Sequence, residues 1–252
     1  MVCLVINGRK MPNSDAFAAG LININKNIKS IMLNVNTAKT NVILGSKNIL
    51  LYGSRFISDI ICGNTYHISP TSFYQVNRRA TEILYTIAGD LAAPNKDETL
   101  LDLYCGIGTI GLSLANRVKR VVGVEIVPDA VDDAKKNAQI NNIKNAEFIC
   151  GDAEAAARLL MQQGEHADII IVDPPRKGCS PILLETIFKM SPKKIVMISC
   201  NSATMARDIK ILTNMGYNIQ KIQPVDMFPR TGHVETVVLL SKLNTKQHIE
   251  VE

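Results

Sequence analysis

The 252-residue sequence has no apolar run of about 18 residues, and its first residues lack both the long apolar stretch and the small-residue cleavage site of a secretory signal. These absences disfavour a membrane-spanning helix and secretion, and we expect a soluble cytoplasmic protein. The six cysteines form no Cys-x-x-Cys pair, which argues against a zinc site and a disulfide framework. We therefore expect reduced thiols and no metal. With 46% apolar and 20% charged residues, the composition excludes disorder, collagen and coiled coil and predicts a globular core.

The positive charge is unevenly distributed. Residues 1–90 hold nine Lys and Arg against four Asp and Glu, whereas residues 91–252 hold 19 of each kind. The whole net charge of +5 therefore lies in the first third of the chain. A mildly basic segment beside a neutral one is typical of a protein that meets a polyanion through its basic side.

The first third has a pattern of its own. Apolar and polar residues alternate over residues 30–53, first at Ile31, Leu33 and Val35 and then at Val42 and Leu44, which predicts antiparallel strands. Apolar residues at helical spacing then predict a helix over residues 71–91, followed by a polar break over residues 93–98. We predict a small β-rich (α+β) domain over residues 1–70 and a second domain over residues 71–252.

From residue 99 onward, apolar runs of about six residues alternate with helical stretches of about ten or more, as in βαβ units. Two further apolar runs follow with no helix between them. The pattern predicts an α/β fold with a doubly wound, mostly parallel, seven-stranded Rossmann-like sheet that ends in a hairpin. The predicted strands cover residues 99–104, 120–126, 146–150, 167–173, 193–200, 216–228 and 235–241.

A glycine-rich motif follows the first of these strands. Gly106, Gly108 and Gly111 match G-x-G-x-x-G at the start of a helix, and Glu125 ends the next strand, where its carboxylate can accept hydrogen bonds from ribose hydroxyls. The glycines alone could make no more than a tight turn. The acidic residue at the proper distance favours an adenosine-type ligand, although this motif does not separate NAD from S-adenosylmethionine.

Three more strands end in residues that carry chemistry. Asp152 follows the third strand, where it can meet an adenine amino group, and Asp173 follows the fourth strand before two prolines. Ligands of open α/β sheets bind beyond the carboxyl ends of the strands, so these side chains can converge, although Asp173 taken alone could equally cap a helix. Cys200 ends the fifth strand just before a helix N-terminus, an environment that makes cysteines reactive. The other five cysteines are expected to be buried, inert thiols.

These residues lie in a recognisable ordered set. The set comprises SFYQVN (72–77), DLYCGIGTIGL (102–112), GVEIVPDAVDDAKKNAQIN (123–141), DPPRKG (173–178), SCN-x-AT (199–204) and MFPRTGHVET (227–236). It resembles the RNA uracil-5-methyltransferase family, particularly its 23S ribosomal RNA branch, across essentially the whole chain. The resemblance implies transfer of a methyl group from S-adenosylmethionine to C5 of a uridine in 23S rRNA.

The resemblance also implies roles for individual residues. It makes Cys200 the nucleophile and Glu235 the general base. Uracil C5 is a poor nucleophile, so a thiolate adds to C6 and a base then removes the C5 proton. The alternative for Glu235 is a surface residue flanking the following strand. The implied cofactor residues are Gln75, Tyr104, Gly106, Gly108, Glu125, Asp152 and Asp173.

The resemblance further implies an RNA partner and an RNA-facing segment over residues 1–70, with the methyltransferase domain over residues 71–252. A stacked base is out of reach, so we expect a flipped or single-stranded uridine, with Phe73, Tyr74 and Phe228 as candidate stacking surfaces. Ser202 stands where the family commonly has proline, and Arg230 where it often has histidine. Family members are usually much longer, with an N-terminal β-barrel and in some an iron–sulfur cluster, so we expect the C-terminal part of a longer protein.

Three alternatives stay open. The chain could methylate an exocyclic amine of RNA or DNA, with Asp173 and the two prolines as the active motif, but such enzymes more often have an aromatic residue where this chain has Arg176. It could be an inactive fragment that only binds cofactor or RNA. The substrate could also be tRNA instead of rRNA.

Overall fold

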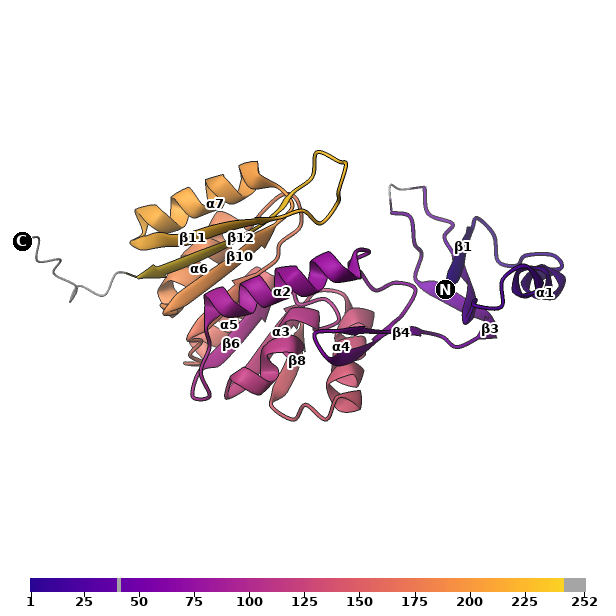
Figure 1. Ribbon diagram of the computed structural model, residues 1–252, viewed down its shortest axis with the longest axis horizontal. Helices are drawn as coiled ribbons and strands as arrows, with labels where there is room; N and C mark the ends of the chain where they lie inside the picture. Colours follow the sequence, from indigo (N-terminus) through magenta and orange to yellow (C-terminus); the bar gives the residue numbers. More distant parts are fainter. Residues whose placement is uncertain (40–41, 243–252) are drawn as a thin grey trace, which may run out of the picture. The chain divides into compact units, whose positions relative to one another are not determined.

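The computed structural model describes residues 1–39 and 42–242 and divides the chain into two compact units (Figure 1). The N-terminal unit comprises Met1–Ile60 and Thr65–Tyr74. The C-terminal unit comprises Ile61–Asn64 and the chain from Gln75 onward.

The N-terminal unit contains a three-stranded sheet in the order β1 (Val2–Ile6), β2 (Ser30–Val35) and β3 (Lys47–Gly53). Strands β2 and β3 are antiparallel, as the alternation of apolar residues predicts. Strands β1 and β2 are parallel, because helix α1 (Ser14–Ile24) returns the chain to the same end of the sheet. The unit is therefore α+β, and the sequence pattern shows only its antiparallel half.

The strand predicted around Val42 and Leu44 is wrong, since neither residue lies in a strand. Asn34 explains part of the difference: its Nδ2 donates to Gly45 O at 2.7 Å, and its Oδ1 accepts from Gly45 N at 2.6 Å. The Asn36 side chain likewise donates to Val42 O at 2.7 Å. These amides occupy backbone groups that a strand would pair with a neighbour, so pairing begins only at β3.

A hairpin of β4 (Ile57–Ile61) and β5 (Asn64–Ile68) follows, and it is not among the predicted elements. Its two turn residues, Cys62 and Gly63, have φ of 50° and 81°. Positive φ at both positions is typical of the tight turns that join antiparallel strands. The turn groups with the C-terminal unit, where Asn64 Nδ2 donates to Leu112 O at 3.1 Å.

Helix α2 (Arg78–Ala92) begins seven residues later than predicted. The Asn77 side chain accepts a hydrogen bond from Ala80 N at 3.2 Å and so caps the helix start. Phe73 and Val76, which fit the helical spacing, are 76% and 85% exposed and do not contribute to the core. The prediction of a helix from residue 71 is therefore wrong in its first two turns.

The C-terminal unit is built on a seven-stranded sheet in the order β11-β12-β10-β9-β6-β7-β8. The strands β6 to β10 run parallel, and β12 pairs antiparallel with both β10 and β11. The predicted fold class is confirmed, including the final hairpin. The strands are β6 (Thr99–Leu103), β7 (Arg120–Glu125), β8 (Ala146–Cys150), β9 (Ile169–Val172), β10 (Lys194–Ser199), β11 (Tyr217–Val225) and β12 (Glu235–Lys242).

Helices cover both faces of this sheet (Figure 1). The helices α5 (Ala153–Gln162), α6 (Pro181–Met190) and α7 (Ser202–Asn214) share one apolar core with the strands. On the other face lie α2, α3 (Thr109–Leu114), a short 3-10 turn (Ala115–Arg117) and α4 (Pro128–Ile140). The central strand β9 is fully buried, as expected for a strand covered on both faces.

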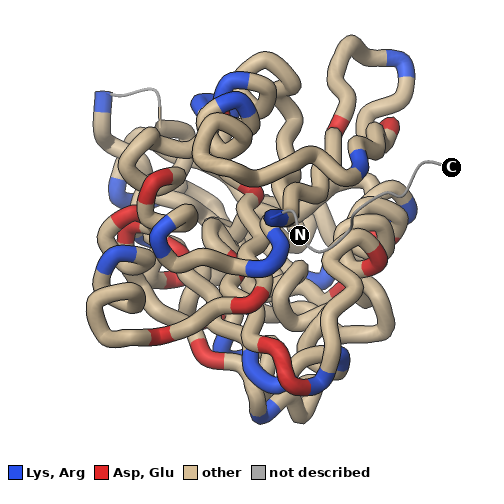
Figure 2. Tube along the Cα trace, turned by 90° about the vertical axis from the view of Figure 1, so that its left-hand side faces the viewer, with Lys and Arg blue, Asp and Glu red and all other residues tan. Residues whose placement is uncertain are grey.

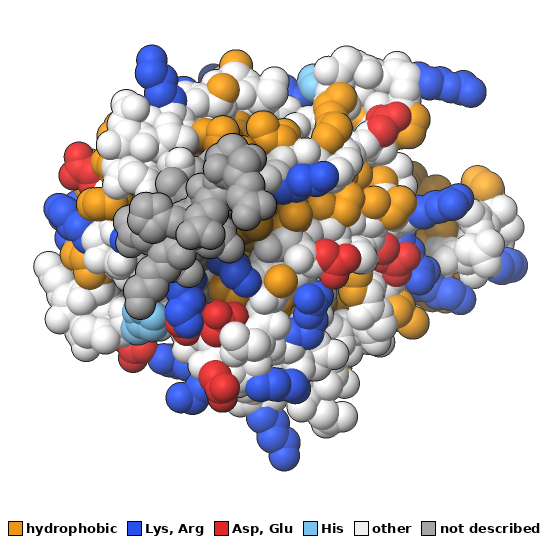
Figure 3. Space-filling view, turned by 60° about the vertical axis from the view of Figure 1, so that its left-hand side comes forward, with side chains coloured by type: hydrophobic (Ala, Val, Ile, Leu, Met, Phe, Trp, Pro, Cys, Tyr) orange, Lys and Arg blue, Asp and Glu red, His pale blue; other side chains and the backbone are white. Residues whose placement is uncertain are grey.

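The charges differ between the two units. The N-terminal unit carries seven Lys and Arg against two Asp and Glu, and the C-terminal unit carries 21 of each kind. Figure 2 shows the acidic and basic residues at many separate positions along the chain. On the face in Figure 3, charged side chains interrupt the apolar ones. Within the described residues, no helix is both long and apolar enough to cross a membrane.

All six cysteines are free. Cys105 and Cys179 are buried as expected, but Cys62 and Cys150 are exposed, so the prediction of buried thiols is wrong for these two. Cys62 lies in the hairpin turn and Cys150 ends the edge strand β8, and neither position can be enclosed by neighbouring strands. Over residues 1–39 and 42–242, no three His, Cys, Asp or Glu side chains gather as metal ligands would.

Candidate active site

The carboxyl edge of the seven-stranded sheet gathers most of the residues singled out in the sequence. Read in the order of neighbouring strands, this edge carries Cys200 after β10, Asp173 after β9, Tyr104 after β6, Glu125 at the end of β7 and Asp152 after β8. Neighbouring strands lie about 4.8 Å apart, so residues far apart in sequence follow one another along the edge. This is the edge at which open α/β sheets bind ligands.

Glu235 reaches the same edge from the opposite direction. Because β12 runs antiparallel to β10, its first residue lies beside the last residues of β10. Ser199 pairs with Thr236, and the residues one step beyond this pair are Cys200 and Glu235. Glu235 is only 5% exposed, so it is not the surface residue of the alternative interpretation.

A cavity of about 570 Å³ opens beside Cys200. It is lined by Arg176, by residues 200–202, by residues 232–234 and by Thr236. Asn201 caps α7, since its Oδ1 accepts hydrogen bonds from Ala203 N at 3.1 Å and Thr204 N at 3.4 Å. The half-buried Cys200 thus stands at the start of a capped helix and on the wall of a cavity large enough for a nucleobase.

Two carboxyl groups near the cavity have raised pKa values. Burial raises the pKa of Glu235, and the nearby Arg176 guanidinium counteracts part of that rise. Burial, the charge of Glu235 and the charge of Asp102 together raise the pKa of Asp173 to about 8. Asp173 therefore lies within electrostatic reach of the cavity on one side and of β6 on the other. Among the described residues, its carboxyl group has no hydrogen-bond partner.

The glycine-rich loop and Glu125 are joined directly. Glu125 Oε2 accepts a hydrogen bond from Gly106 N at 3.1 Å, and Oε1 accepts one from Val127 N at 2.9 Å. Gly106 and Gly108 have φ of 54° and 84°, which glycine adopts without strain. A Cβ on Gly106 would meet no atom within 4 Å, so the loop leaves open space at this point.

Asp102 lies in β6, directly before this loop, and is not among the site residues predicted from the sequence. Its Oδ2 accepts a hydrogen bond from Gly111 N at 2.9 Å, whereas its buried Oδ1 has no partner among the described residues. Burial, together with the charge of Glu125, raises the pKa of Asp102 to about 7 although the Gly111 hydrogen bond lowers it. The only sign of Asp102 in the sequence is that it is the one acidic residue of an otherwise apolar strand.

The remaining predicted residues differ in how closely they join this group. Asp152 Oδ1 accepts hydrogen bonds from Glu154 N at 3.0 Å and Ala155 N at 3.1 Å and so caps α5. Tyr104 has an unusual φ of 68°. Burial is the main reason that its pKa is raised, and nearby acidic groups raise it further. Gln75 lies just before α2, and in the described part of the chain no hydrogen bond ties it to the glycine-rich loop.

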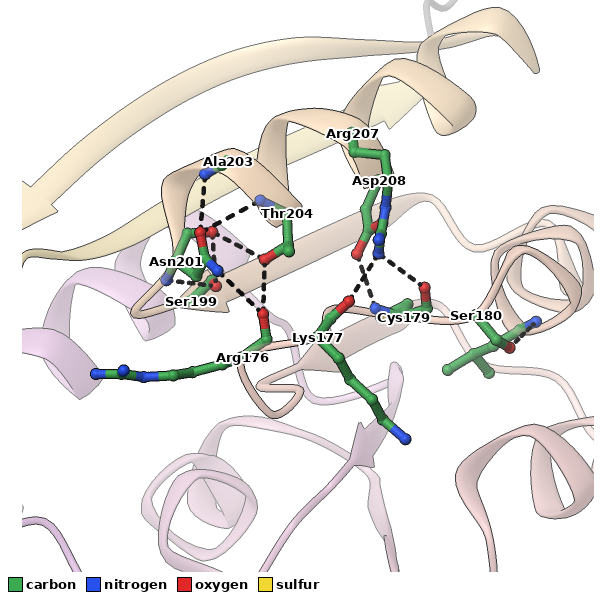
Figure 4. A network of polar contacts seen from close by, with 11 residues as sticks. Arg176, Lys177, Cys179, Ser180, Ser199, Asn201, Ala203, Thr204, Arg207 and Asp208 are labelled. Carbon is green, nitrogen blue, oxygen red and sulfur yellow. Dashed lines mark hydrogen bonds and ion pairs between the residues drawn. The ribbon is translucent and has the colours of Figure 1, made fainter.

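The loop that carries Asp173 and Arg176 is fastened to α7 (Figure 4). Arg176 O accepts hydrogen bonds from Asn201 Nδ2 and Thr204 Oγ1, both at 3.1 Å. In the next turn of α7, Arg207 Nη2 donates to Lys177 O at 2.9 Å. Hydrogen bonds therefore join this loop to the first turns of the helix that follows Cys200.

Comparisons with known proteins agree with this architecture. The sequence model of the tRNA (uracil-5-)-methyltransferase family matches residues 15–243. The chain belongs to the RNA uracil-5-methyltransferase family. A Bacillus cereus protein described as an uncharacterized RNA methyltransferase is 48% identical over 243 residues, which cover 96% of this chain and 53% of that protein. A Clostridium tetani protein with the same description is 44% identical over 247 residues, covering 98% of this chain and 54% of that protein. The chain thus spans about half the length of the curated relatives it matches.

Solved structures place this family member among methyltransferases. The crystal structure of the Pyrococcus abyssi tRNA (uracil-54, C5)-methyltransferase in complex with S-adenosyl-L-homocysteine matches with a TM-score of 0.76 and 33% identity, covering 94% of this chain and 55% of that one. A putative methyltransferase from Streptococcus mutans matches with a TM-score of 0.62 at 13% identity, covering 90% of this chain and 65% of that one. The second likeness shows the fold alone.

Proposed function

We propose that this chain carries the catalytic part of an enzyme that transfers a methyl group from S-adenosylmethionine to C5 of a uridine in 23S rRNA. The observation that carries the proposal is the cavity at the carboxyl edge, where Cys200 lines the wall and the buried Glu235 stands between two further lining residues, Val234 and Thr236. Methylation of an exocyclic amine needs neither a thiol nor this second carboxylate, so the pair favours C5 chemistry.

Cys200 is the proposed nucleophile. Its thiolate adds to C6 of uracil and forms a carbon–sulfur bond, while the C5–C6 electron pair moves toward O4 and makes C5 electron-rich. Covalent addition divides one difficult substitution at C5 into easier steps. When the C5 proton has later been removed, its electron pair re-forms the C5–C6 double bond and expels the thiolate.

Glu235 is the proposed general base that accepts this C5 proton. Burial raises its pKa, which makes its carboxylate a better proton acceptor near neutral pH. The Arg176 guanidinium lowers the same pKa and so favours the charged form that can act as a base. The two opposing effects suit a group that must be ionised before the step and protonated after it.

The residues of the carboxyl edge fit S-adenosylmethionine. The open space at Gly106 and the carboxylate of Glu125 suit a ribose, and Asp152, the cap of α5, is the proposed partner of the adenine amino group. Asp173, without a hydrogen-bond partner among the described residues, suits the positive charge of the cofactor, and Tyr104, Gly108 and Gln75 are proposed as further contacts. When bound, S-adenosylmethionine supplies an electrophilic methyl group.

The proposed RNA contact involves the N-terminal unit. Its excess of seven basic over two acidic residues suits a phosphate backbone. The overall resemblance of the sequence to the 23S rRNA branch of the family supports 23S rRNA as the substrate. A tRNA substrate is the second candidate, because the Pyrococcus abyssi protein with 33% identity is described as a tRNA methyltransferase.

The test is nucleoside mass spectrometry after the chain is incubated with S-adenosylmethionine and unmodified 23S rRNA or tRNA. We expect 5-methyluridine in the rRNA, none with Cys200→Ala, and a decrease of about 10²–10⁴-fold with Glu235→Gln. Glu235→Gln is also expected to accumulate a covalent protein–RNA adduct, since the thiolate cannot leave before the C5 proton does. Cys3→Ala, in β1, is the matched thiol control and is expected to keep full activity.

Each contrary result has a definite meaning. A methylated amine without 5-methyluridine, or full activity of Cys200→Ala, contradicts the proposed chemistry. Methylation of tRNA alone would transfer the same chemistry to the second substrate. Cofactor binding without turnover on either RNA would favour the inactive-fragment alternative.

A further inference from the structure

Asn77 joins two segments that lie 150 residues apart in the sequence. Its side-chain oxygen accepts a hydrogen bond from Ala80 N at 3.2 Å, which caps α2. Its side-chain nitrogen donates to Met227 O at 3.0 Å. The Asn77 side chain therefore makes two separate interactions. The bond from Ala80 N is a normal helix cap, whereas the bond to Met227 O is not part of capping.

Met227 lies at the start of the loop between β11 and β12, where burial and hydrogen bonds hold it in place. Its side chain is fully buried, and its sulfur accepts a hydrogen bond from Thr81 Oγ1 at 3.8 Å. Its backbone nitrogen donates to Val225 O at 3.0 Å. Apart from the bonds made by Asn77 and Thr81, no hydrogen bond within the described residues ties residues 226–234 to an element outside β11 and β12.

Contacts within the loop connect Met227 and Phe228 to the residues that line the cavity. Phe228 O accepts hydrogen bonds from Thr231 N at 3.1 Å and Thr231 Oγ1 at 2.7 Å. Thr231 Oγ1 in turn accepts one from His233 N at 3.2 Å, and the rings of Phe228 and His233 meet edge to face with centroids 6.5 Å apart. His233 lines the same cavity as Cys200. The position of the cavity wall at residues 232–234 thus depends on where Met227 and Phe228 are held.

We propose that Asn77 is a positioning residue, which sets the cavity wall at residues 232–234 relative to Cys200 through its hydrogen bond to Met227 O. The inference rests on the proposed function, because the wall encloses the proposed site of uracil addition. It assigns to the last residue of the SFYQVN segment a task in shaping the site, in addition to capping a helix.

Asn77→Asp separates the two tasks. Aspartate is as good a helix cap as asparagine, so the bond from Ala80 N is kept. Its carboxylate has no hydrogen to donate and would face the Met227 carbonyl oxygen, so the bond to the loop is lost. Ala80→Gly is the matched control, because glycine weakens the first turn of α2 without touching the bond between Asn77 and Met227.

Two measurements decide the proposal. In Asn77→Asp, we expect backbone amides of residues 228–234 to exchange with deuterium about fivefold faster, which is the effect of losing about 1 kcal/mol of hydrogen bonding. We expect kcat for 5-methyluridine formation to fall about 10–100-fold, as for a catalytic site displaced by up to about 1 Å. The dissociation constant of S-adenosylhomocysteine is expected to change less than about twofold, since the α2 cap is kept. Ala80→Gly should leave both loop exchange and kcat close to wild type.

Unchanged loop exchange in Asn77→Asp overturns the proposal. So does an equal loss of kcat in Asn77→Asp and Ala80→Gly, since both would then act through the stability of α2. Hydrogen exchange needs no turnover, so it decides whether Asn77 holds the loop even for a wild-type chain that makes no 5-methyluridine. That inactivity would count against the proposed function alone.

Discussion

Asp208 offers the strongest test of how the loop over residues 173–178 is held. Its side chain is 1% exposed, and Oδ2 accepts a hydrogen bond from Cys179 N at 2.7 Å. Its Oδ1 accepts two more from Arg207, at 2.9 Å from Nε and 2.7 Å from Nη2. Asp208→Asn keeps the shape of the side chain but replaces one acceptor oxygen with an NH₂ group, which must then face a donor.

The expected loss follows from these contacts. A hydrogen bond to a charged group contributes about 1.5–3 kcal/mol, and the variant loses at least one of them. Arg207 is 52% exposed, so water compensates for much of its lost partner, and the full cost of breaking a buried ion pair does not apply. We expect a destabilisation of about 2–3 kcal/mol, which lowers the melting temperature of a unit of this size by about 4–12 °C.

Differential scanning calorimetry measures this change, with Asp90→Asn as the matched control. Asp90 is 69% exposed and lies 3.6 Å from Arg117, so the same substitution should cost less than about 0.5 kcal/mol there. A loss for Asp208→Asn no larger than that of the control would refute the reasoning. It would mean that the loop is held mainly by the bonds from Asn201 and Thr204 to Arg176 O and from Arg207 to Lys177 O.

Two further predictions concern the carboxyl edge. Because the pKa of Asp173 is about 8 in the folded chain and 3.8 as the ordinary value, the folded state retains a proton that the unfolded state loses, and stability declines as pH rises between these values. Asp173→Asn should therefore raise the melting temperature more at pH 8 than at pH 5, and an equal effect at both would contradict the assignment. Gly111→Ala places a Cβ 2.9 Å from Val121 Cγ1 and 3.0 Å from Asp102 Oδ2, so urea unfolding should show a loss of about 1–3 kcal/mol. Ser113→Ala, in the same helix, should be nearly neutral, and equal stability of the two variants would refute the steric argument.

The sequence predicted the C-terminal sheet well because its strands are buried on both faces. Such strands are continuous apolar runs, and β9 is the clearest example, with all four residues fully buried. The N-terminal unit gave weaker signals. Strand β1 is a short apolar run, and the apolar residues of β3 are only partly buried, so neither pattern marks a strand clearly. Asparagine side chains, such as that of Asn34, also bond to backbone groups that a strand ladder would use, and no periodicity reveals this.

The start of α2 shows why periodicity alone misplaces a boundary. Phe73 and Val76 continue the spacing of the apolar residues that follow, so the pattern extends the helix into the SFYQVN segment. The local chemistry of Asn77 decides otherwise, since its side chain is an acceptor suited to capping. The bond from Asn77 to Met227 O joins segments 150 residues apart, so no local sequence motif can reveal it. The contacts of Arg207 and Asp208 with residues 177–179 likewise join segments about 30 residues apart, and no sequence motif reveals them.

The position of Glu235 depends on the one antiparallel strand of the sheet. The carboxyl ends of parallel strands supply Asp173 and Cys200, but a residue at the amino end of a parallel strand would lie at the opposite edge. Strand β12 enters between β10 and β11 in reverse, so its first residue arrives next to the last residues of both neighbours. Val225 of β11 pairs directly with Glu235. A buried carboxylate at the start of this strand is thus held by the sheet itself, while the wall of the cavity at residues 232–234 belongs to a loop that must be positioned separately. This difference is why a change at Asn77 is expected to move the wall and leave the backbone of Glu235 in place.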